Sequence, residues 1–324
     1  MSFQSYVIRR IGQVIVTYWA FLTILFVLFR VVPGDPVSMH VQDLGAEARE
    51  ERIAELGLDQ PLYVQYVEYL RQLARADLGQ SMIYNESVWN IIVVKFWNTI
   101  ILMAASLILA YAIGILGGAL LAWYRGTAFE KGGIVLTLLA RSSPEFWTGI
   151  VLLGVFVFWL GLFPVGGMRS IGSELATGVG RYLSWDFVYH AVLPALTGAI
   201  YFLGTPALLM RNSMLDVLNA DFIEIKKAEG LHPWNVLYKH AVRNSILPLV
   251  TIAAIAVGMA IGGSVVIETV FNWPGMGRAM VDAVNNNDYQ LAMAAFFLMG
   301  SVVILMNFVA DLLYVYLDPR VTYE

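Results

Sequence analysis

The sequence contains no cysteine among its 324 residues. This absence excludes disulfide bridges, thiolate metal ligands and a cysteine nucleophile. Charged residues are also scarce, at 14% of the chain, whereas hydrophobic residues make up 59% and the mean hydropathy is +0.68. A chain this apolar cannot hide its hydrophobic surface inside one soluble core, so the composition indicates contact with lipid.

Motifs of enzymes and nucleotide-binding proteins are absent as well. The sequence holds no G-x-x-x-x-G-K-[ST] phosphate-binding loop, no H-E-x-x-H zinc motif and no G-x-S-x-G nucleophile elbow. The four histidines, His40, His190, His232 and His240, form no such zinc pair. We therefore expect no catalytic residue, no metal and no cofactor on this chain. If ATP drives it, another polypeptide binds the ATP.

Long apolar runs recur along the chain. A helix needs about 20 mostly apolar residues to cross a membrane. Six runs meet this need: residues 11–29, 96–123, 134–162, 191–210, 246–267 and 291–317. No segment alternates as membrane β-strands do, so the sequence predicts an all-α polytopic membrane protein with about six transmembrane helices.

Charged and proline residues interrupt the third run. Arg141, Pro144 and Glu145 predict a kinked or tilted span whose charged turn is held within the protein. On a continuous helix, Arg141 and Glu145 would share a face and could form an ion pair. Two roles stay open for them: a structural pair or anchor at the cytoplasmic edge, and a part in gating. Glu268 and Asp311 lie near span ends, where we expect solvated or capping roles.

Lysine and arginine residues gather beside alternate span ends, which indicates the cytoplasmic side. Arg9 and Arg10 precede the first span, and a larger group separates the fourth from the fifth: Arg211, Lys226, Lys227, Lys239 and Arg243. We therefore predict a multi-pass protein of the cell membrane with both termini in the cytoplasm. Its predicted parts are the N-terminus with the first span (1–30), an external helical segment (31–95) and a core domain (96–324).

The predicted external segment shows helical patterning. A helix is expected from Asp59, with Pro61 in its first turn and an apolar face formed by Tyr63, Val67, Leu70 and Ala74. Residues 46–56 are a second helical candidate. A cap that shields the mouth of the bundle and a surface that receives a partner are both open roles for this segment.

Residues 221–248, DFIEIKKAEGLHPWNVLYKHAVRNSILP, form what we call the docking segment. Asp221 is expected to cap a first helix, with Glu224 reaching back to it. Gly230 supplies the left-handed residue that ends this helix, and His232 and Pro233 begin the next one. The pattern predicts two short helices joined at a glycine corner, which present a docking surface on the cytoplasmic side.

Motifs along the whole chain resemble those of permease subunits in ABC importers of the dipeptide/oligopeptide, binding-protein-dependent type. In the docking segment the resemblance rests on Ala228-Glu229-Gly230, His240-Ala241, Asn244 and Pro248. Elsewhere it rests on Arg9-Arg10, Pro33-Gly34-Asp35-Pro36, Leu56-Gly57-Leu58-Asp59, Asp77-Leu78-Gly79, His190-Ala191-Val192-Leu193-Pro194, ETVFNWPGMGR from Glu268 to Arg278, Asp288-Tyr289, Asp311-Leu312-Leu313-Tyr314 and Asp318-Pro319-Arg320. The broader importer pattern, Glu-Ala-Ala, three residues, Gly, is kept at Glu224 and Gly230. Ile225 and Lys226 replace its alanines, as in the peptide-type subgroup.

The resemblance implies a permease without its own ATPase activity. Its expected partners are a second permease in a heterodimer, two cytoplasmic ATPases and an external substrate-binding protein, with no nucleic acid. The coupling part is expected within residues 211–245, and the residues expected to meet the ATPase are Asp221, Phe222, Glu224, Ile225, Ala228, Gly230, His232 and Pro233. A helix lying on the lipid headgroups is the alternative for this part.

The expected activity is substrate movement by alternating access, and an ion-coupled secondary carrier is the alternative. Di- and oligopeptides are the favoured substrates, while nickel complexes and oligosaccharides stay open.

Overall fold

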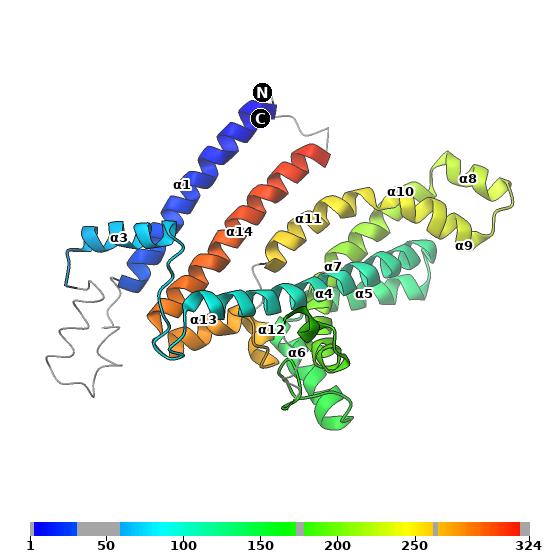
Figure 1. Ribbon diagram of the computed structural model, residues 1–324. Coiled ribbons are helices and arrows are strands. Elements are labelled where there is room, and N and C mark those ends of the chain that lie inside the picture. Colours follow the sequence, from blue (N-terminus) through cyan, green and yellow to red (C-terminus); the bar gives the residue numbers. More distant parts are fainter. Residues whose placement is uncertain (1–2, 31–58, 173–177, 262–264, 318–324) are drawn as a thin grey trace. The chain divides into compact units, whose positions relative to one another are not determined.

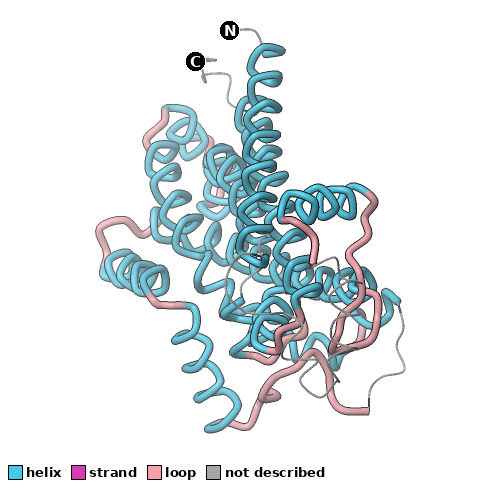
Figure 2. Tube along the Cα trace, turned by 90° about the vertical axis from the view of Figure 1, so that its left-hand side faces the viewer, coloured by secondary structure: helices cyan, strands magenta, loops and turns pink. Residues whose placement is uncertain are grey.

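The computed structural model describes residues 3–30, 59–172, 178–261 and 265–317, and every named element in these ranges is a helix. Figure 2 shows the same chain as helices joined by loops. The chain divides into two compact units. The first contains residues 1–98 and 275–305, and the second contains 99–274 and 306–322. The expectation of a helix at residues 46–56 lies outside the described residues.

The first unit comprises α1 (Phe3–Arg30), α3 (Leu62–Ala74), the start of α4 (Val88–Trp123), α13 (Met276–Asn285) and most of α14 (Tyr289–Leu317). Asp288 sets the start of α14, because its carboxylate accepts a hydrogen bond from the Leu291 N–H at 3.2 Å. The same carboxylate accepts a hydrogen bond from the buried Ser81 hydroxyl. Leu291 belongs to the main hydrophobic cluster of this unit, so the polar cap adjoins the apolar core.

Helix α3 differs from its prediction in start and in orientation. It begins at Leu62, with Pro61 at the N-cap position, three residues after Asp59. Tyr63 and Val67 are exposed, whereas Tyr69 is buried in a cluster with Leu22 and Phe26 of α1. The expected apolar face was therefore wrong for Tyr63, Val67 and Ala74, whereas Leu70 packs against the cluster, because α3 is apolar on more than one side and its period alone does not tell which side packs.

The second unit holds the rest of α4 and the following elements in chain order: α5 (Ala128–Ser142), α6 (Glu145–Leu152), η1 (Leu153–Trp159), η2 (Gly178–Tyr182), α7 (Trp185–Leu218), α8 (Asp221–Ala228), α9 (Pro233–Asn235), η3 (Val236–Val242), α10 (Arg243–Ser245), α11 (Leu247–Ile261) and α12 (Val265–Val270). Within this unit, α8 and α9 lie at one end and α6 lies at the other (Figure 1). The Ser184 side chain caps α7 by accepting a hydrogen bond from the Phe187 N–H at 3.1 Å. Helix α7 joins the two ends.

Four helices in the described ranges are long and apolar enough to cross a membrane, and up to six if each of two bent helix pairs counts as one span. The four lie at Tyr6–Arg30, Val88–Trp123, Trp185–Leu218 and Tyr289–Leu312, where four of the runs were predicted. The third predicted run is sharply bent, since Ala128–Ser142 and Glu145–Trp159 meet at 107°, as in a broken span or a re-entrant loop. The fifth predicted run overlaps the second bent pair, in which Pro233–Ser245 and Leu247–Ala260 meet with a bend of 51°.

The break in the third run follows from its sequence. The Ser143 N–H closes the last turn of α5 on the Leu139 carbonyl at 3.0 Å. Pro144 follows as the N-cap residue of α6. Because proline disfavours helical backbone at the residue before it and cannot donate a backbone hydrogen bond, α5 ends there and α6 starts in a new direction. The predicted kink is confirmed.

Candidate functional site

The docking segment folds as two short helical pieces around a glycine corner. Gly230 has φ of +73°, the left-handed conformation that glycine adopts at little cost. Its N–H donates to the Lys227 carbonyl at 3.0 Å, and the Leu231 N–H donates to the Lys226 carbonyl at 3.4 Å. This pair of bonds is the Schellman motif, which satisfies carbonyl groups at the end of a helix. The predicted role of Gly230 in ending the helix is confirmed.

The two helix starts differ in how well they were predicted. Pro233 is the first residue of α9, and the His232 ring accepts a hydrogen bond from the Trp234 N–H at 3.4 Å. Ala220, however, occupies the N-cap position of α8, and no side chain caps it. The expected cap at Asp221 was therefore wrong by one residue. Asp221 and Glu224 lie in the first turn, where their charges still favour the helix dipole.

Helix α8 is held to the protein through Ile223. Its side chain is fully buried, at 0% exposure, in a hydrophobic cluster that we call the anchor cluster. The anchor cluster also includes Val236 and Leu237 of η3 and Met210 and Met214 of α7. Both arms of the docking segment therefore pack on α7. No role for Ile223 was predicted from the sequence. Its inward-facing position becomes clear in the structure, where its neighbours Phe222 and Glu224 are exposed.

All the residues expected to meet an ATPase are exposed: Asp221, Phe222, Glu224, Ile225, Ala228, Gly230, His232 and Pro233. At about 100° per helical residue, Asp221, Ile225 and Ala228 lie on the side of α8 opposite Ile223. Phe222 and Ile225 are 38% and 56% exposed, and Lys226 pairs beside them with Glu229 at 2.8 Å. Apolar residues with a polar rim are the usual anatomy of a protein interface.

An exposed aromatic pair extends this surface, and sequence reasoning missed it. Trp234 and Tyr238 stack with ring centroids 5.6 Å apart and planes at 8°. They are 46% and 40% exposed. Their spacing of four residues was the available signal, because side chains at i and i+4 of a helix are neighbours. The docking segment thus exposes four large apolar side chains, Phe222, Ile225, Trp234 and Tyr238.

A buried ion pair braces the same end of the unit. Arg211 of α7 donates from Nε to Oε1 of Glu130 in α5 at 2.9 Å. The other oxygen of Glu130 accepts a hydrogen bond from the Gly126 N–H at 2.6 Å. In the sequence of α7, Arg211 follows Met210 and precedes Met214, which both belong to the anchor cluster. The α4–α5 loop, α7 and the docking segment are thus joined by polar and apolar contacts.

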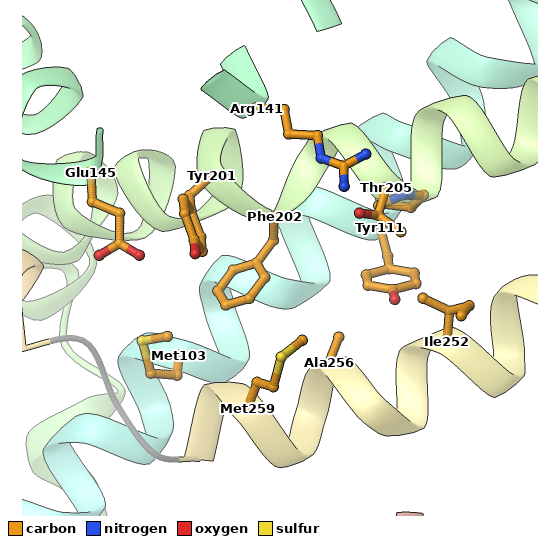
Figure 3. Close-up of a pocket in the computed structure, with 11 residues that line it drawn as sticks. Met103, Tyr111, Arg141, Glu145, Tyr201, Phe202, Thr205, Ile252, Ala256 and Met259 are labelled. Atoms are coloured by element: carbon orange, nitrogen blue, oxygen red, sulfur yellow. The ribbon is translucent and has the colours of Figure 1, made fainter. Parts of the chain in front are cut away.

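A cavity of about 370 Å³ lies further along the same unit (Figure 3). Its lining comes from five helices and is mostly aromatic, aliphatic and methionine side chains, with two charged residues: Met103 and Tyr111 of α4, Arg141 of α5, Glu145 of α6, Tyr201, Phe202, Thr205 and Pro206 of α7, and Ile252, Ala256 and Met259 of α11. A mostly apolar cavity with a few polar groups is the usual form of a small-molecule site.

The charged residues of the cavity come from the two sides of the α5–α6 break. Arg141 is in the last turn of α5 and Glu145 in the first turn of α6. In Figure 3 they lie on opposite sides of Tyr201, and no ion pair joins the two in the described ranges. The 107° bend explains this separation, because only a continuous helix places residues i and i+4 together. The expected ion pair between Arg141 and Glu145 was therefore wrong, whereas an anchor at the cytoplasmic edge and a part in gating stay predictions.

The environment of Glu268 also differs from the predicted one. Instead of being solvated at a span end, it is 0% exposed, and the buried Thr99 hydroxyl donates to its carboxylate at 2.5 Å. In the described part of the chain, no group of three or more His, Asp or Glu side chains is arranged to hold a metal ion.

Comparison with known families decides what kind of protein this is. Residues 114–323 match the family described as the binding-protein-dependent transport system inner membrane component. The chain belongs to this family. Residues 3–103 of the permease also match the N-terminal model for membrane components of such systems.

Named relatives cover the whole permease. It is 34% identical over 335 residues to the di/tripeptide transport system permease protein DppB of Pseudomonas aeruginosa, covering 99% of both chains. It is 34% identical over 321 residues to the oligopeptide transport system permease protein AppB of Bacillus subtilis, covering 98% of this chain and 99% of that one. The dipeptide transport system permease protein DppB of Escherichia coli is 34% identical over 338 residues, with 99% of both covered.

Two solved structures share the fold. Both are inward-facing conformations of the MetNI methionine ABC transporter, with TM-scores of 0.52 and 0.53 over 70% of this permease and 95% and 96% of the matched chains. Their sequence identities are 16% and 18%, so the likeness concerns the fold alone. The predicted all-α fold and family are confirmed. The chain is a multi-pass permease subunit of a binding-protein-dependent ABC importer, and the comparisons give no support to an ion-coupled carrier.

Proposed function

We propose that this permease imports di- and oligopeptides by alternating access, using ATP that separate cytoplasmic ATPases bind and hydrolyse. The similarity to permeases of di/tripeptide, dipeptide and oligopeptide transport systems supports the peptide substrate. The family description supports a partnership with an external binding protein. A second permease in a heterodimer and two ATPases complete the proposed assembly. Catalysis of ATP hydrolysis is assigned to those partners, because the chain has no phosphate-binding loop.

The docking segment is the proposed contact with an ATPase. Its exposed apolar residues Phe222, Ile225, Trp234 and Tyr238 would fill an apolar socket, and Lys226, Lys227 and Glu229 would form the rim. The observation that carries this assignment is the two-sided build of α8. One side chain, Ile223, fixes it to the permease, and the opposite side is exposed.

Transmission from this contact to the cavity would follow α7. Met214 of α7 packs in the anchor cluster, and Thr205 of the same helix lines the cavity. Their separation of nine residues corresponds to about 14 Å at 1.5 Å per helical residue. Helix α7, which contains Pro206 in this stretch and is braced by the Glu130–Arg211 pair and by the anchor cluster, would carry ATPase movement to the cavity.

The proposed topology follows from the same assignment. The docking segment meets cytoplasmic ATPases, so residues 211–245 and both termini are assigned to the cytoplasm. Residues 31–95 form the external segment, and residues 96–324 form the core permease domain with its coupling part at 211–245. The distribution of lysine and arginine supports this orientation.

Co-purification tests the proposal. An affinity-tagged permease, extracted in mild detergent from its native membrane, is expected to carry its ATPases with it. Ile225→Asp places a charge in the proposed contact and should abolish this, whereas the matched control Ile171→Asp changes an exposed isoleucine outside the docking segment and should retain it. Equal ATPase recovery from both variants would overturn the docking assignment.

A further inference from the structure

Helix α3 carries an apolar stripe that its packing on α1 leaves uncovered. Tyr63 and Val67 are 73% and 52% exposed, and Ala74 is exposed as well. At about 100° per helical residue, the three side chains lie within about 40° of one another around α3, and we call them the α3 stripe. They belong to none of the hydrophobic clusters of the described residues. An apolar stripe of this kind indicates a surface that is covered in the working protein.

The opposite side of α3 is polar. Gln65, Glu68 and Gln72 lie about 140–200° from Tyr63 around the helix. Glu68 forms an ion pair there with Arg71, whose Nη1 lies 2.5 Å from a carboxylate oxygen of Glu68, and both side chains are exposed to about half. The exposed surface of α3 thus divides into an apolar and a charged side. This is the pattern of a helix that lies in the plane of a membrane interface.

Helix α3 is attached to the apolar span of α1 itself, close to its end. The ring of Phe26 packs against Tyr66 and Tyr69, with centroids 5.1 and 5.6 Å apart. The hydroxyl groups of Tyr66 and Thr23 share a hydrogen bond of 2.7 Å. Because a helix rises 1.5 Å per residue, Phe26 and Thr23 lie about 6 and 10 Å before Arg30, where the span ends. Figure 1 shows α3 crossing α1 in this part.

The side of α1 that holds Tyr66 is also exposed and apolar. Trp19 and Val27 lie four residues before and after Thr23, and both are exposed. Side chains four residues apart are neighbours on a helix, so these two share the Thr23 side of α1. Exposed apolar residues on a span face lipid unless another subunit covers them. Helix α3 therefore packs on a side of the span where lipid is the expected neighbour.

The depth of α3 favours lipid over a water-soluble partner. An interfacial helix places its apolar face about 5–10 Å into the boundary between headgroups and acyl chains. The contacts at Phe26 and Thr23 hold α3 at this depth relative to the end of the span. Tyrosine is enriched at the headgroup level, because its ring is apolar and its hydroxyl group is polar, so Tyr63 suits the same position.

We propose that α3 is an interfacial helix, with the α3 stripe in the phospholipid leaflet at the Arg30 end of α1 and the side of Glu68 and Gln72 toward water. Lipid then holds the predicted external segment against the membrane surface. The proposal goes beyond the proposed function, because it depends on the membrane location of the protein and not on its substrate.

The test uses the complete transporter in nanodiscs of phosphatidylcholine and phosphatidylglycerol, with all other subunits made free of cysteine. Val67→Cys places a thiol on the α3 stripe, and the matched control Gln72→Cys places one on the polar side; both positions are exposed. The permease has no cysteine of its own, so a nitrobenzoxadiazole fluorophore on the thiol reports one position. Its fluorescence is quenched separately with phospholipid that carries a nitroxide near the top of an acyl chain and with iodide in the buffer.

The label at Val67→Cys should emit at a shorter wavelength and lose fluorescence to the nitroxide lipid but not to iodide. The label at Gln72→Cys should lose more fluorescence to iodide than to the lipid. Adding Tyr63→Asp should reduce lipid quenching at Val67→Cys, because a charged side chain resists burial in the membrane. Adding Glu68→Gln, on the polar side, should leave that quenching unchanged.

Three results would overturn the inference. The first is equal iodide quenching at the two positions, because the α3 stripe would then face water. The second is protection of the Val67→Cys label from both quenchers, because protein would then cover the stripe. The third is lipid quenching at Val67→Cys that disappears when binding protein is added, because the stripe would then serve that protein. None of these results depends on peptide import, so failure of the proposed function is recognised separately.

Discussion

Ile223→Ala is expected to loosen α8 while leaving the rest of the permease folded. Ile223 is fully buried in the anchor cluster, and it is the buried residue of α8. The substitution removes three carbon groups, worth about 0.8 kcal/mol each in transfer from water. With the cavity that remains, the total is about 3 kcal/mol, inside the range of about 2–5 kcal/mol for such truncations. This loss falls on the attachment of α8.

Hydrogen exchange of the α8 amides, measured by mass spectrometry on the purified permease, reports this attachment. A loss of about 3 kcal/mol corresponds to exchange roughly 150-fold faster, if α8 opens as a local unit. Ile223→Val, which costs about 0.5–1.5 kcal/mol, should accelerate exchange by roughly 2- to 13-fold. Ile225→Ala is the matched control, because Ile225 is 56% exposed and should leave exchange near that of the unaltered protein.

In the assembled transporter, both substitutions should weaken ATPase binding, each for a different reason. Ile225→Ala should reduce ATPase binding through its lost outer contact, and Ile223→Ala should do so through a poorly placed α8. Exchange in Ile223→Ala that equals the unaltered protein would refute the anchoring. So would an acceleration in Ile225→Ala as large as in Ile223→Ala.

Three further predictions concern the backbone and packing around the docking segment. Gly230→Val should cost about 1–2 kcal/mol or more, because valine is strained in the left-handed conformation, and it should lower the ATPase stimulation caused by loaded binding protein. Gly230→Asn tolerates that conformation and should retain most of the stimulation. Equal stimulation in both variants would contradict the account. Arg211→Gln should lower the thermal unfolding midpoint, because it leaves the buried Glu130 without its ionic partner. Lys226→Gln breaks an exposed ion pair and should leave the midpoint unchanged. Differential scanning fluorimetry measures both midpoints. Gly118→Ala should destabilise the permease by about 1–3 kcal/mol, because the new Cβ would lie 2.3 Å from the Ala207 carbonyl oxygen. Gly117→Ala places its Cβ where nothing lies within 4 Å and should stabilise the permease by about 0.5–1 kcal/mol. Unfolding midpoints that shift in the same direction would contradict the packing of α4 on α7.

Features with a local chemical cause were predicted well from the sequence. Gly230 ends a helix because glycine accepts positive φ, and Pro144 breaks a span because proline ends the preceding helix. The long spans follow from the length of apolar sequence that a bilayer requires. The exposed side of the docking segment followed from its charged residues and the resemblance of its motif.

Features that depend on tertiary partners were missed or misplaced. Glu130 and Arg211 are 81 residues apart, and the sequence around each residue does not indicate that the two form an ion pair. Glu268 is buried because Thr99 of a distant helix covers it, whereas hydropathy places it at a span end. Helix α3 packs through Tyr69 instead of Tyr63, since the partner helix α1 decides which apolar side is covered. The cap at Ala220 instead of Asp221 is a shift of one residue, the usual uncertainty of a helix end.

Peptide uptake into proteoliposomes tests the central claim most directly. The permease is reconstituted with its second permease and ATPases, with ATP on the ATPase side, loaded binding protein on the other side and ion gradients dissipated by ionophores. We predict that labelled peptide accumulates on the ATPase side and that omitting ATP, ATPases or binding protein abolishes accumulation. Accumulation by the permease alone, driven by an imposed ion gradient without any ATPase, would contradict the account.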